Sequence, residues 1–156
     1  MKLVLAGSVG LCGVLREAEK PENAALLRQI FPARFLAHWE KDAAAQLAAE
    51  RPCDAEIRED LSEGVFAALW RLGEKAGCGF TVRMEALALS PYTTEIAEAL
   101  DLDPYLLPGS GYAALREEPG AGERVIGETT PGAARVVESG DRKRYLVPPE
   151  RTVKDR

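Results

Sequence analysis

Several residue types that usually carry chemistry or hold small folds together are scarce in this sequence. Its 156 residues include one histidine, His38, and three cysteines, Cys12, Cys53 and Cys78. A single histidine excludes a histidine cluster or a histidine-based triad within one chain. Because the number of cysteines is odd and no two have a C-x-x-C spacing, we expect neither a disulfide framework nor a zinc site. Reduced thiols point to a cytoplasmic protein.

Long apolar runs are also missing. No apolar stretch reaches the roughly 20 residues that a membrane helix needs, so we expect no membrane partner. The apolar run at residues 3–11 follows one basic residue, is interrupted by Gly7 and Gly10, and precedes no small-x-small cleavage site. It therefore differs from a secretion signal.

Motifs of self-contained nucleotide sites are absent, since neither G-x-x-x-x-G-K-[ST] nor G-x-G-x-x-G occurs. Basic charge is not in excess either, because 20 basic residues face 25 acidic ones and the net charge is −5. A phosphate backbone selects for a basic face, so nucleic acid is not an expected partner. The one dense basic run, Arg142-Lys143-Arg144, is short and follows Asp141, which favours a solvated turn.

The composition is that of an ordinary globular protein, with 46% hydrophobic and 29% charged residues. A chain of this length fits one domain that needs no disulfide or metal to stabilise it. We expect that domain to span residues 1–149. The polar residues 150–156 are expected to form a frayed tail.

Apolar residues at spacings of three and four predict helices through the first two thirds of the chain. Pro21 and Ser90-Pro91 are typical helix starts, and Gly77 is the expected C-cap of the clearest helix. The expected helical segments are 9–19, 21–31, 33–50, 65–76 and one that begins at Pro91, with a short turn at Asp103-Pro104.

Strands are expected mainly in the last third. The expected segments are 3–6, 53–59, 80–84, 112–115, 125–128, 135–137 and an edge strand at 145–147. Residues 109–111 are predicted to form a turn, and segments 125–128 and 135–137 a hairpin joined near Pro131-Gly132. Roughly five helices with four to six short strands predict an α+β fold with a mixed β-sheet layered with helices.

The segment Asp60-Leu61-Ser62-Glu63-Gly64 places three polar side chains where a strand is expected to end and a helix to begin. Free backbone N–H groups at a helix start favour anions, and Asp60 and Glu63 could hold Mg²⁺ through oxygen ligands. The alternative is structural, because Asp60 as N-cap with Glu63 three residues later has the layout of a capping box. The residues alone favour the capping box.

Set among other motifs, this segment resembles the C-terminal domain of the aminoimidazole ribonucleotide (AIR) synthase superfamily, most closely its HypE-like, AIR synthase-related subgroup. The further matches are Gly10-Leu11-Cys12-Gly13, Gly77-Cys78-Gly79-Phe80, Leu100-Asp101-Leu102-Asp103-Pro104-Tyr105, Gly109-Ser110-Gly111-Tyr112 and Val125-Ile126-Gly127-Glu128. Each motif is weak alone, but the ordered set spans nearly the whole chain.

The resemblance implies a fold like the C-terminal domain of PurM. The complete enzymes of the superfamily have two domains and use ATP and Mg²⁺ to phosphorylate or activate an oxygen atom. Their N-terminal domain carries most of the ATP and metal carboxylates, and the C-terminal domain closes the cleft. By resemblance, Asp60, Ser62, Glu63 and Gly64 would face that cleft. Its lining would include Gly10, Gly13, Gly109, Ser110 and Gly111.

Two departures limit what the resemblance implies. The chain starts at the first strand of this domain, so we expect the isolated chain to bind neither ATP nor Mg²⁺. Asp60 would contribute to a magnesium site only beside a separate N-terminal ATP-binding partner. In addition, about nine residues join strands 112–115 and 125–127, where the superfamily commonly has a helix. One layer of the domain is therefore expected to be thin.

Three interpretations of function stay open. The first is a free-standing small-molecule or phosphate-ligand binding module that self-associates as a homo-oligomer, because an apolar face that a partner domain normally covers must be covered otherwise. The second is half of a split ATP-dependent enzyme, HypE-like or kinase-like, which needs a separate N-terminal ATP-binding partner. The third is a remnant that folds without a function. The sequence does not decide whether the chain is an enzyme.

Overall fold

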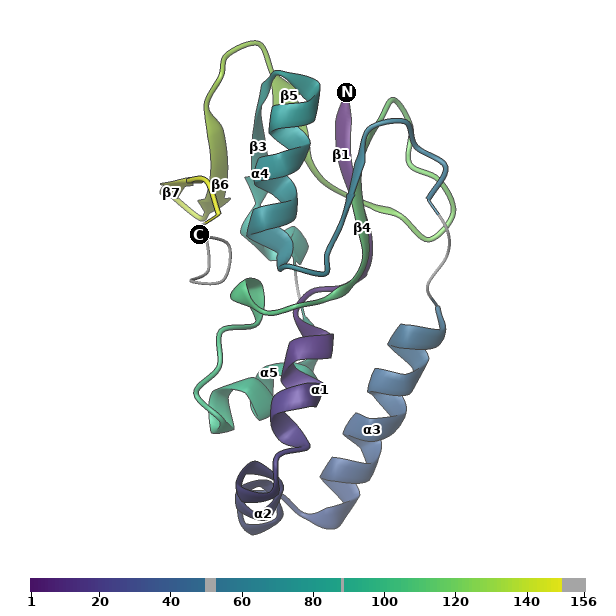
Figure 1. Ribbon diagram of the computed structural model, residues 1–156, viewed down its shortest axis with the longest axis vertical. Helices are drawn as coiled ribbons and strands as arrows, with labels where there is room; N and C mark the ends of the chain where they lie inside the picture. The colour runs from purple at the N-terminus through teal and green to yellow at the C-terminus, as the bar shows by residue number, and fades with distance from the viewer. Residues whose placement is uncertain (50–52, 88, 150–156) are drawn as a thin grey trace, which may run out of the picture.

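The computed structural model describes residues 1–49, 53–87 and 89–149, so the tail expected at 150–156 lies outside the described residues. Its centre is a seven-stranded sheet with the order β2-β4-β1-β5-β3-β6-β7 (Figure 1). The strands are β1 (Lys2–Ser8), β2 (Arg58–Asp60), β3 (Gly79–Arg83), β4 (Ser110–Arg116), β5 (Arg124–Thr130), β6 (Arg135–Ser139) and β7 (Arg142–Tyr145). The β3–β6 pair is parallel and the other pairs are antiparallel, so the sheet is mixed.

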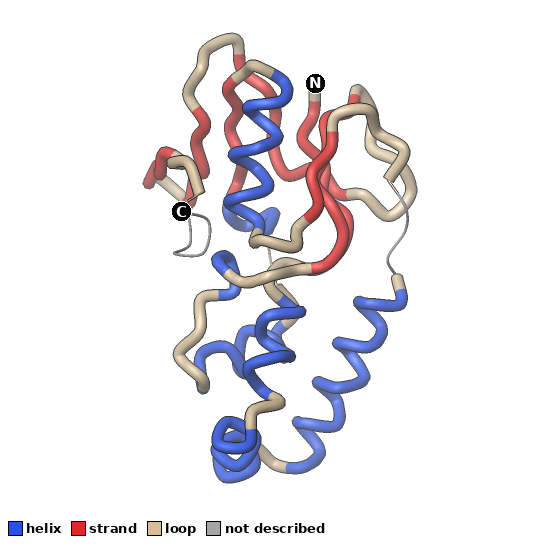
Figure 2. The backbone as a smooth tube through the Cα atoms, in the orientation of Figure 1, coloured by secondary structure: helices blue, strands red, loops and turns tan. Residues whose placement is uncertain are grey.

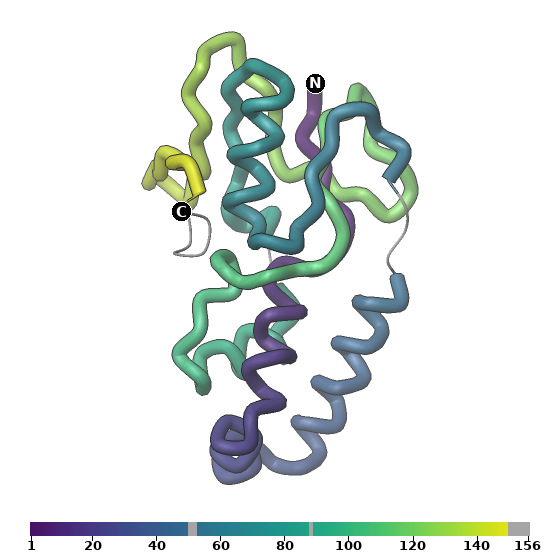
Figure 3. The backbone as a smooth tube through the Cα atoms, in the orientation of Figure 1, coloured from purple at the N-terminus to yellow at the C-terminus, as the bar shows by residue number. Residues whose placement is uncertain are grey.

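The helices divide into two groups. They are α1 (Leu11–Ala18), α2 (Pro21–Ile30), α3 (Ala33–Ala48), α4 (Val65–Ala76) and α5 (Pro91–Ala99), with short 3₁₀ turns η1 (Met84–Leu87) and η2 (Pro104–Leu106). Helix α4 runs along the sheet, whereas α1, α2, α3 and α5 gather beyond one end of it (Figure 2). The chain leaves the middle of the sheet through β1, passes through α1 to α3, and returns to the sheet edge at β2 (Figure 3). The α+β fold with a mixed sheet layered with helices is thus confirmed.

Two hydrophobic clusters account for this arrangement. The larger cluster lies between α4 and the sheet, and it includes the fully buried residues Leu5, Leu69, Leu72 and Phe80. The α4 residues recur at the helical spacing that predicted the apolar stripe, and burial of each large side chain contributes about 1.5–3 kcal/mol. The second cluster surrounds Trp39 and joins α1, α2, α3 and α5.

Helix ends follow the predicted signals. Pro21 is the first residue of α2, and the Ser90 hydroxyl accepts a hydrogen bond from the backbone N–H of Thr93 at the start of α5. Gly77 ends α4 in the left-handed conformation, with φ of 66°. In the described part of the chain, no helix combines the length and apolar character that crossing a bilayer requires.

The second face of the sheet has a thinner cover. A small cluster of Val4, Ala55, Tyr112 and Ala114 lies there. The connection between β4 and β5, residues 117–123, contains no helix, as the sequence predicted. This face is therefore covered by loops and by the end of α3 (Figure 1).

Residues 109–111 form no turn, which corrects the prediction made from their glycines. Ser110 and Gly111 are the first residues of β4, and they pair with Ser8 and Gly7 of β1. Glycine weakens strands in general. Here the two strands approach so closely that Gly111, with φ of 91°, has no room for a side chain.

The expected hairpin of segments 125–128 and 135–137 is also wrong. Strand β3 lies between β5 and β6 and pairs with both. The hairpin partner of β6 is β7, so Arg142-Lys143-Arg144 forms an exposed edge strand instead of the predicted turn. Charged residues are common on an edge strand because they oppose pairing with other chains.

Candidate functional site

The segment at residues 60–64 has a different geometry from a capping box. Asp60 ends β2, and its Oδ1 accepts hydrogen bonds from the backbone N–H of Ser62, at 3.0 Å, and from the Ser62 hydroxyl. Gly64, with φ of 100°, is the N-cap of α4 and has no side chain to accept a hydrogen bond. Glu63 pairs with Arg71. The favoured capping-box interpretation is therefore wrong, because the strand runs on to Asp60 and helix α4 starts late.

The charge of Asp60 is stabilised locally. The side-chain and backbone hydrogen bonds from Ser62 lower the pKa of Asp60. The Asp60 carboxylate is hydrogen-bonded to Ser62, and the Glu63 carboxylate forms an ion pair with Arg71. The two carboxylates therefore have separate partners. The described residues contain no group of three or more His, Cys, Asp or Glu side chains that could hold a metal ion. Mg²⁺ is commonly held by one or two carboxylates together with water and phosphate oxygens, so a contribution of Asp60 beside a partner domain stays a prediction.

Three of the glycines expected to line a ligand cleft pack against protein atoms. A Cβ on Gly10 would lie 2.1 Å from the Pro104 carbonyl oxygen, and one on Gly109 would lie 2.2 Å from the Ser8 carbonyl oxygen. A Cβ on Gly13 would lie 2.5 Å from the Leu107 Cβ. These glycines allow backbone segments to touch, and their role toward a ligand stays a prediction.

The structure brings the 60–64 and 109–111 segments together. The backbone N–H of Leu61 donates to the Gly111 carbonyl at 3.1 Å, and the N–H of Gly109 donates to the Leu61 carbonyl at 2.8 Å. Asp60 pairs with Tyr112 across β2 and β4. Asp60 and Gly111 both line an open hollow of about 490 Å³, which also has Lys75 in its wall.

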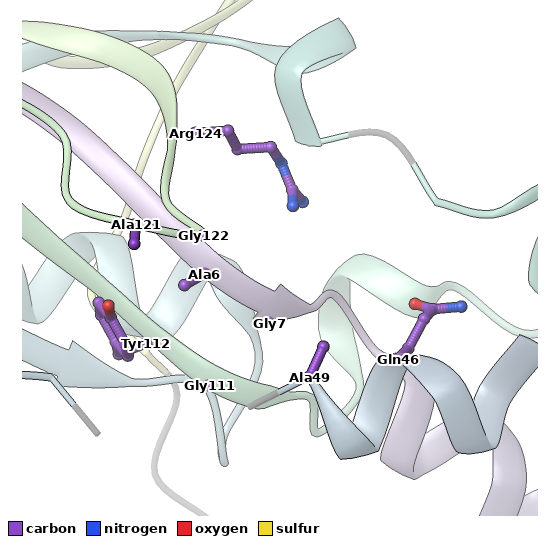
Figure 4. Close-up of a pocket in the computed structure, with 9 residues that line it drawn as sticks. All are labelled: Ala6, Gly7, Gln46, Ala49, Gly111, Tyr112, Ala121, Gly122 and Arg124. Carbon is purple, nitrogen blue, oxygen red and sulfur yellow. The ribbon is translucent and has the colours of Figure 1, made fainter. Parts of the chain in front are cut away.

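A second hollow lies beside Gly111, where the sheet opens. Strand β5 begins at Arg124 opposite Leu5 of β1, so no described part of β5 pairs with residues 6–8 at the end of β1. A cleft of about 370 Å³ occupies this place (Figure 4). We call it the β1 cleft, and its lining consists of Ala6, Gly7, Gln46, Ala49, Gly111, Tyr112, Ala121, Gly122 and Arg124.

Arg124 supplies the positive charge of the β1 cleft. Its side chain and that of Gln46 extend toward the same space from two sides (Figure 4). The Arg124 Nε donates to the Ala86 carbonyl at 3.1 Å, and among the described residues no carboxylate pairs with the guanidinium. Partial desolvation lowers the pKa of Arg124 from its usual value, although the group remains a cation at neutral pH. The Gln46 amide nitrogen donates to Asp42, which leaves the amide oxygen for the cleft.

The β1 cleft continues into a narrow polar niche of about 50 Å³. The niche shares Gly7, Gln46 and Arg124 with the cleft, and its other lining residues are Ser8, Val9, Leu11, Leu89, Ser90 and Thr93. The Ser8 and Ser110 hydroxyls share a hydrogen bond of 2.7 Å, so Ser110 lies behind the niche wall. A cation beside hydroxyl groups is a setting that can hold an anionic group.

Sequence reasoning found Gly111 and Ser110 but missed Arg124 and Gln46. An arginine at the start of a strand and a glutamine near a helix end belong to no motif. Arg124 gains its position only because β5 starts opposite the middle of β1, which is a matter of strand register. The glycines at 7 and 111 were the available signal, since paired glycines mark a close approach of two strands.

Comparison with known proteins supports the fold. No protein-family model matches the chain, and neither does any curated protein. Solved structures do match, and they show an α+β fold like the C-terminal domain of PurM, which HypE and thiamine monophosphate kinase share. A structure of the hydrogenase maturation protein HypE aligns with a TM-score of 0.62 and 18% identity over 96% of this chain.

Two further structures agree. HypE from E. coli has a TM-score of 0.59 and 19% identity, and it matches 97% of this chain and 50% of its own. Thiamine monophosphate kinase from Aquifex aeolicus has a TM-score of 0.54 and 19% identity over 95% of this chain and 51% of its own. The chain thus spans about half the length of the structures it matches. At these identities the likeness establishes the fold that the sequence motifs predicted.

Proposed function

We propose that this chain is a binding module for a small phosphate ester that carries hydroxyl groups. The observation that carries the proposal is Arg124, a cation without a carboxylate partner among the described residues, directed into the β1 cleft. A planar guanidinium suits a phosphate group because it can donate two parallel hydrogen bonds. The cleft volume of about 370 Å³ falls within the usual range for small-molecule pockets.

The rest of the ligand follows from the other lining groups. The Gln46 amide oxygen accepts hydrogen bonds, which favours a ligand hydroxyl at that wall. The backbone at the end of β1 lacks a strand partner on the β5 side among the described residues, and it supplies further polar contacts. Glycerol 3-phosphate combines a phosphate with hydroxyl groups and is a suitable probe.

Thermal unfolding with increasing glycerol 3-phosphate tests this proposal. At ten times the Kd, binding should stabilise the folded chain by about 1.4 kcal/mol and raise Tm by about 3–6 °C. Arg124→Ala should abolish the shift. The matched control is Arg142→Ala, which removes the same charge from the edge strand β7 and should keep it. The proposal fails if the wild type shows no shift, or if both variants keep it.

Self-association is part of the proposed module. A groove of about 430 Å³ beside the Phe66–Tyr105 ring stack is bordered by the exposed apolar side chains of Leu106, Tyr145 and Val147. Exposed apolar surface of this kind favours association. Light scattering should give an oligomer mass for the wild type and a monomer mass for Leu106→Glu. A monomeric wild type would contradict the proposed self-association.

A second candidate function is half of an ATP-dependent enzyme. It is favoured by the fold, because a HypE structure in complex with ATP matches 96% of this chain with a TM-score of 0.58, at 16% identity and over 51% of its own length. In this function Asp60, Ser62 and Glu63 would face a separate N-terminal ATP-binding domain, which would supply ATP and Mg²⁺.

The two functions depend on different residues. If the chain is half of an enzyme, mixing it with the N-terminal half of a HypE protein should give a complex and ATP turnover. Asp60→Ala should then remove turnover and keep the thermal shift with glycerol 3-phosphate. Arg124→Ala should keep turnover and abolish that thermal shift. No complex and no turnover in the mixture would count against this candidate.

A further inference from the structure

The connection between β4 and β5 folds back toward the sheet through one carboxylate. Glu123 has a side chain only 1% exposed, although it belongs to a surface loop. Its Oε2 accepts a hydrogen bond of 2.6 Å from the Tyr112 hydroxyl, and its Oε1 accepts one of 2.7 Å from the backbone N–H of Gly120. The N–H of Glu123 in turn donates to the Gly120 carbonyl at 3.2 Å. The turn at residues 120–123 is therefore closed around its own carboxylate.

Arg116 completes the contacts of this carboxylate. Its Nε lies 2.7 Å from the Glu123 Oε1, and its second nitrogen pairs with Asp54. Arg116 is mostly buried, whereas Asp54 is exposed. A charge-assisted contact with a side chain withdrawn from water is stronger than a surface ion pair. The network thus connects β4, the loop and the segment that leads into β2.

The loop held by Glu123 forms part of the β1 cleft. Ala121 and Gly122, which lie between the two ends of the closed turn, line the cleft together with Tyr112 (Figure 4). Arg124 follows Glu123 directly in the chain. A residue that fixes this turn therefore fixes both a wall of the cleft and the starting point of the arginine.

We propose that Glu123 is the positioning residue of the β1 cleft, which holds the wall at residues 121–122 in place and sets the position of Arg124. The ligand part of this inference rests on the proposed function. Glu123 itself does not line the cleft, so it acts through the loop and through Arg124.

The chemistry of the network favours a charged carboxylate over an apolar anchor. Burial alone would raise the pKa of Glu123, but the hydrogen bonds from Tyr112, Gly120 and Arg116 outweigh it and lower the pKa. A buried charge with several donors specifies one loop geometry, because any other geometry leaves the charge unpaired. An apolar side chain would cover the sheet equally well without selecting that geometry.

Glu123→Gln tests the inference, because it keeps the shape of the side chain and removes the charge. Glu118→Gln is the matched control in the same loop. The Glu118 side chain is 82% exposed and forms a surface ion pair with Lys2, with 3.4 Å between Nζ and Oε2. Hydrogen exchange by NMR gives a readout that needs no ligand. In Glu123→Gln, exchange of the backbone amides of Gly120 and of residue 123, which are the hydrogen-bonded amides of the turn, and of the Arg124 Nε–H should rise about tenfold. The amides of Ala113, Ala114 and Ile126 should keep their protection, and Glu118→Gln should resemble the wild type.

Affinity for glycerol 3-phosphate gives the second readout. It should fall about tenfold in Glu123→Gln and stay unchanged in Glu118→Gln. Unchanged exchange in Glu123→Gln would overturn the inference, and so would faster exchange with unchanged affinity. If the wild type does not bind the probe, the proposed function fails. The exchange rate of the Arg124 Nε–H in Glu123→Gln then tests the positioning role of Glu123 by itself. A rate equal to that of the wild type overturns this role, and a faster rate supports it.

Tyr112→Phe is a second variant in case Glu123→Gln does not fold. It removes one hydrogen bond to Glu123 and leaves the aromatic ring in the sheet cluster. Loop exchange should rise by a smaller factor, about three- to tenfold, and no increase in a folded Tyr112→Phe protein would also overturn the inference.

Discussion

At single residues, the ends of β1 and β4 depend on the absence of side chains. Gly7 pairs with Gly111, and a Cβ on either would lie 2.0–2.1 Å from a carbonyl oxygen of the opposite strand. Both residues also have positive φ, at 115° and 91°. Close approach and positive φ together require glycine. The β1 cleft lies over this pair, so its floor is backbone.

Gly111→Ala should therefore destabilise the fold strongly. The added methyl group meets the Ala6 carbonyl oxygen and the left-handed conformation is strained, so we expect a loss of about 3 kcal/mol or more. Gly132→Ala is the matched control, because no atom lies within 4 Å of its added Cβ. Urea unfolding measures both. Equal stability of the two variants would contradict the packing described at this strand pair.

Tyr112 should give a distinct signal at high pH. Burial and the hydrogen bond to Glu123 raise its pKa to about 12. In the unfolded chain the phenol loses its proton near pH 10. The stability that the neutral Tyr112 phenol contributes to the folded state is therefore fully present below about pH 10 and is lost as the pH rises to about 12. Ultraviolet titration of the four tyrosines should show a last step that Tyr112→Phe removes. A last step that persists in Tyr112→Phe would contradict the assignment.

The sequence predicted residue roles well where they depend on local geometry. Ser90 and Gly77 cap helices as expected, because a cap depends on neighbours within one turn. Asp60 was misjudged as an N-cap because the end of β2 depends on its pairing with Tyr112, a residue 52 positions away in the chain (112 − 60). Arg124 was missed for the same reason, since its place depends on strand register.

At the scale of elements, the sequence located most helices and strands but not the order of strands. The apolar stripe of α4 specifies a helix by itself. The position of β3 between β5 and β6 follows from pairings across the whole sheet, which short β-forming runs do not encode. The hairpin of β6 and β7 then contacts α4 through cations over aromatic rings, with Arg135 over Trp70 and Arg144 over Phe66.

Arg135 should stabilise the contact between β6 and α4. Its guanidinium lies 4.4 Å from the Trp70 ring centroid and donates to Glu74 at 2.9 Å. Because the Nε has no hydrogen-bond partner in the described structure, part of the gain is offset, and Arg135→Ala should cost about 1–2 kcal/mol. Urea unfolding followed by tryptophan fluorescence measures the loss. A loss no larger than that of Arg142→Ala, a charge change on exposed β7, would show that the contact contributes nothing.

At the scale of the whole molecule, the fold corresponds to about half of HypE and of thiamine monophosphate kinase. The ordered motifs predicted this fold, although no family model matches the chain. The structure adds a cleft at the thinly covered face of the sheet, next to the hollow that holds Asp60. The two candidate functions are proposed for two neighbouring hollows around Gly111, so they can be tested separately.

An amide chemical-shift map recorded during titration with glycerol 3-phosphate tests the binding proposal most directly. The account predicts saturable shifts at Gly7, Gly111 and Gly122, together with the Arg124 Nε–H, and the loss of these shifts in Arg124→Ala. Shifts confined to residues 61–64, or no saturable shift at any amide, would contradict it.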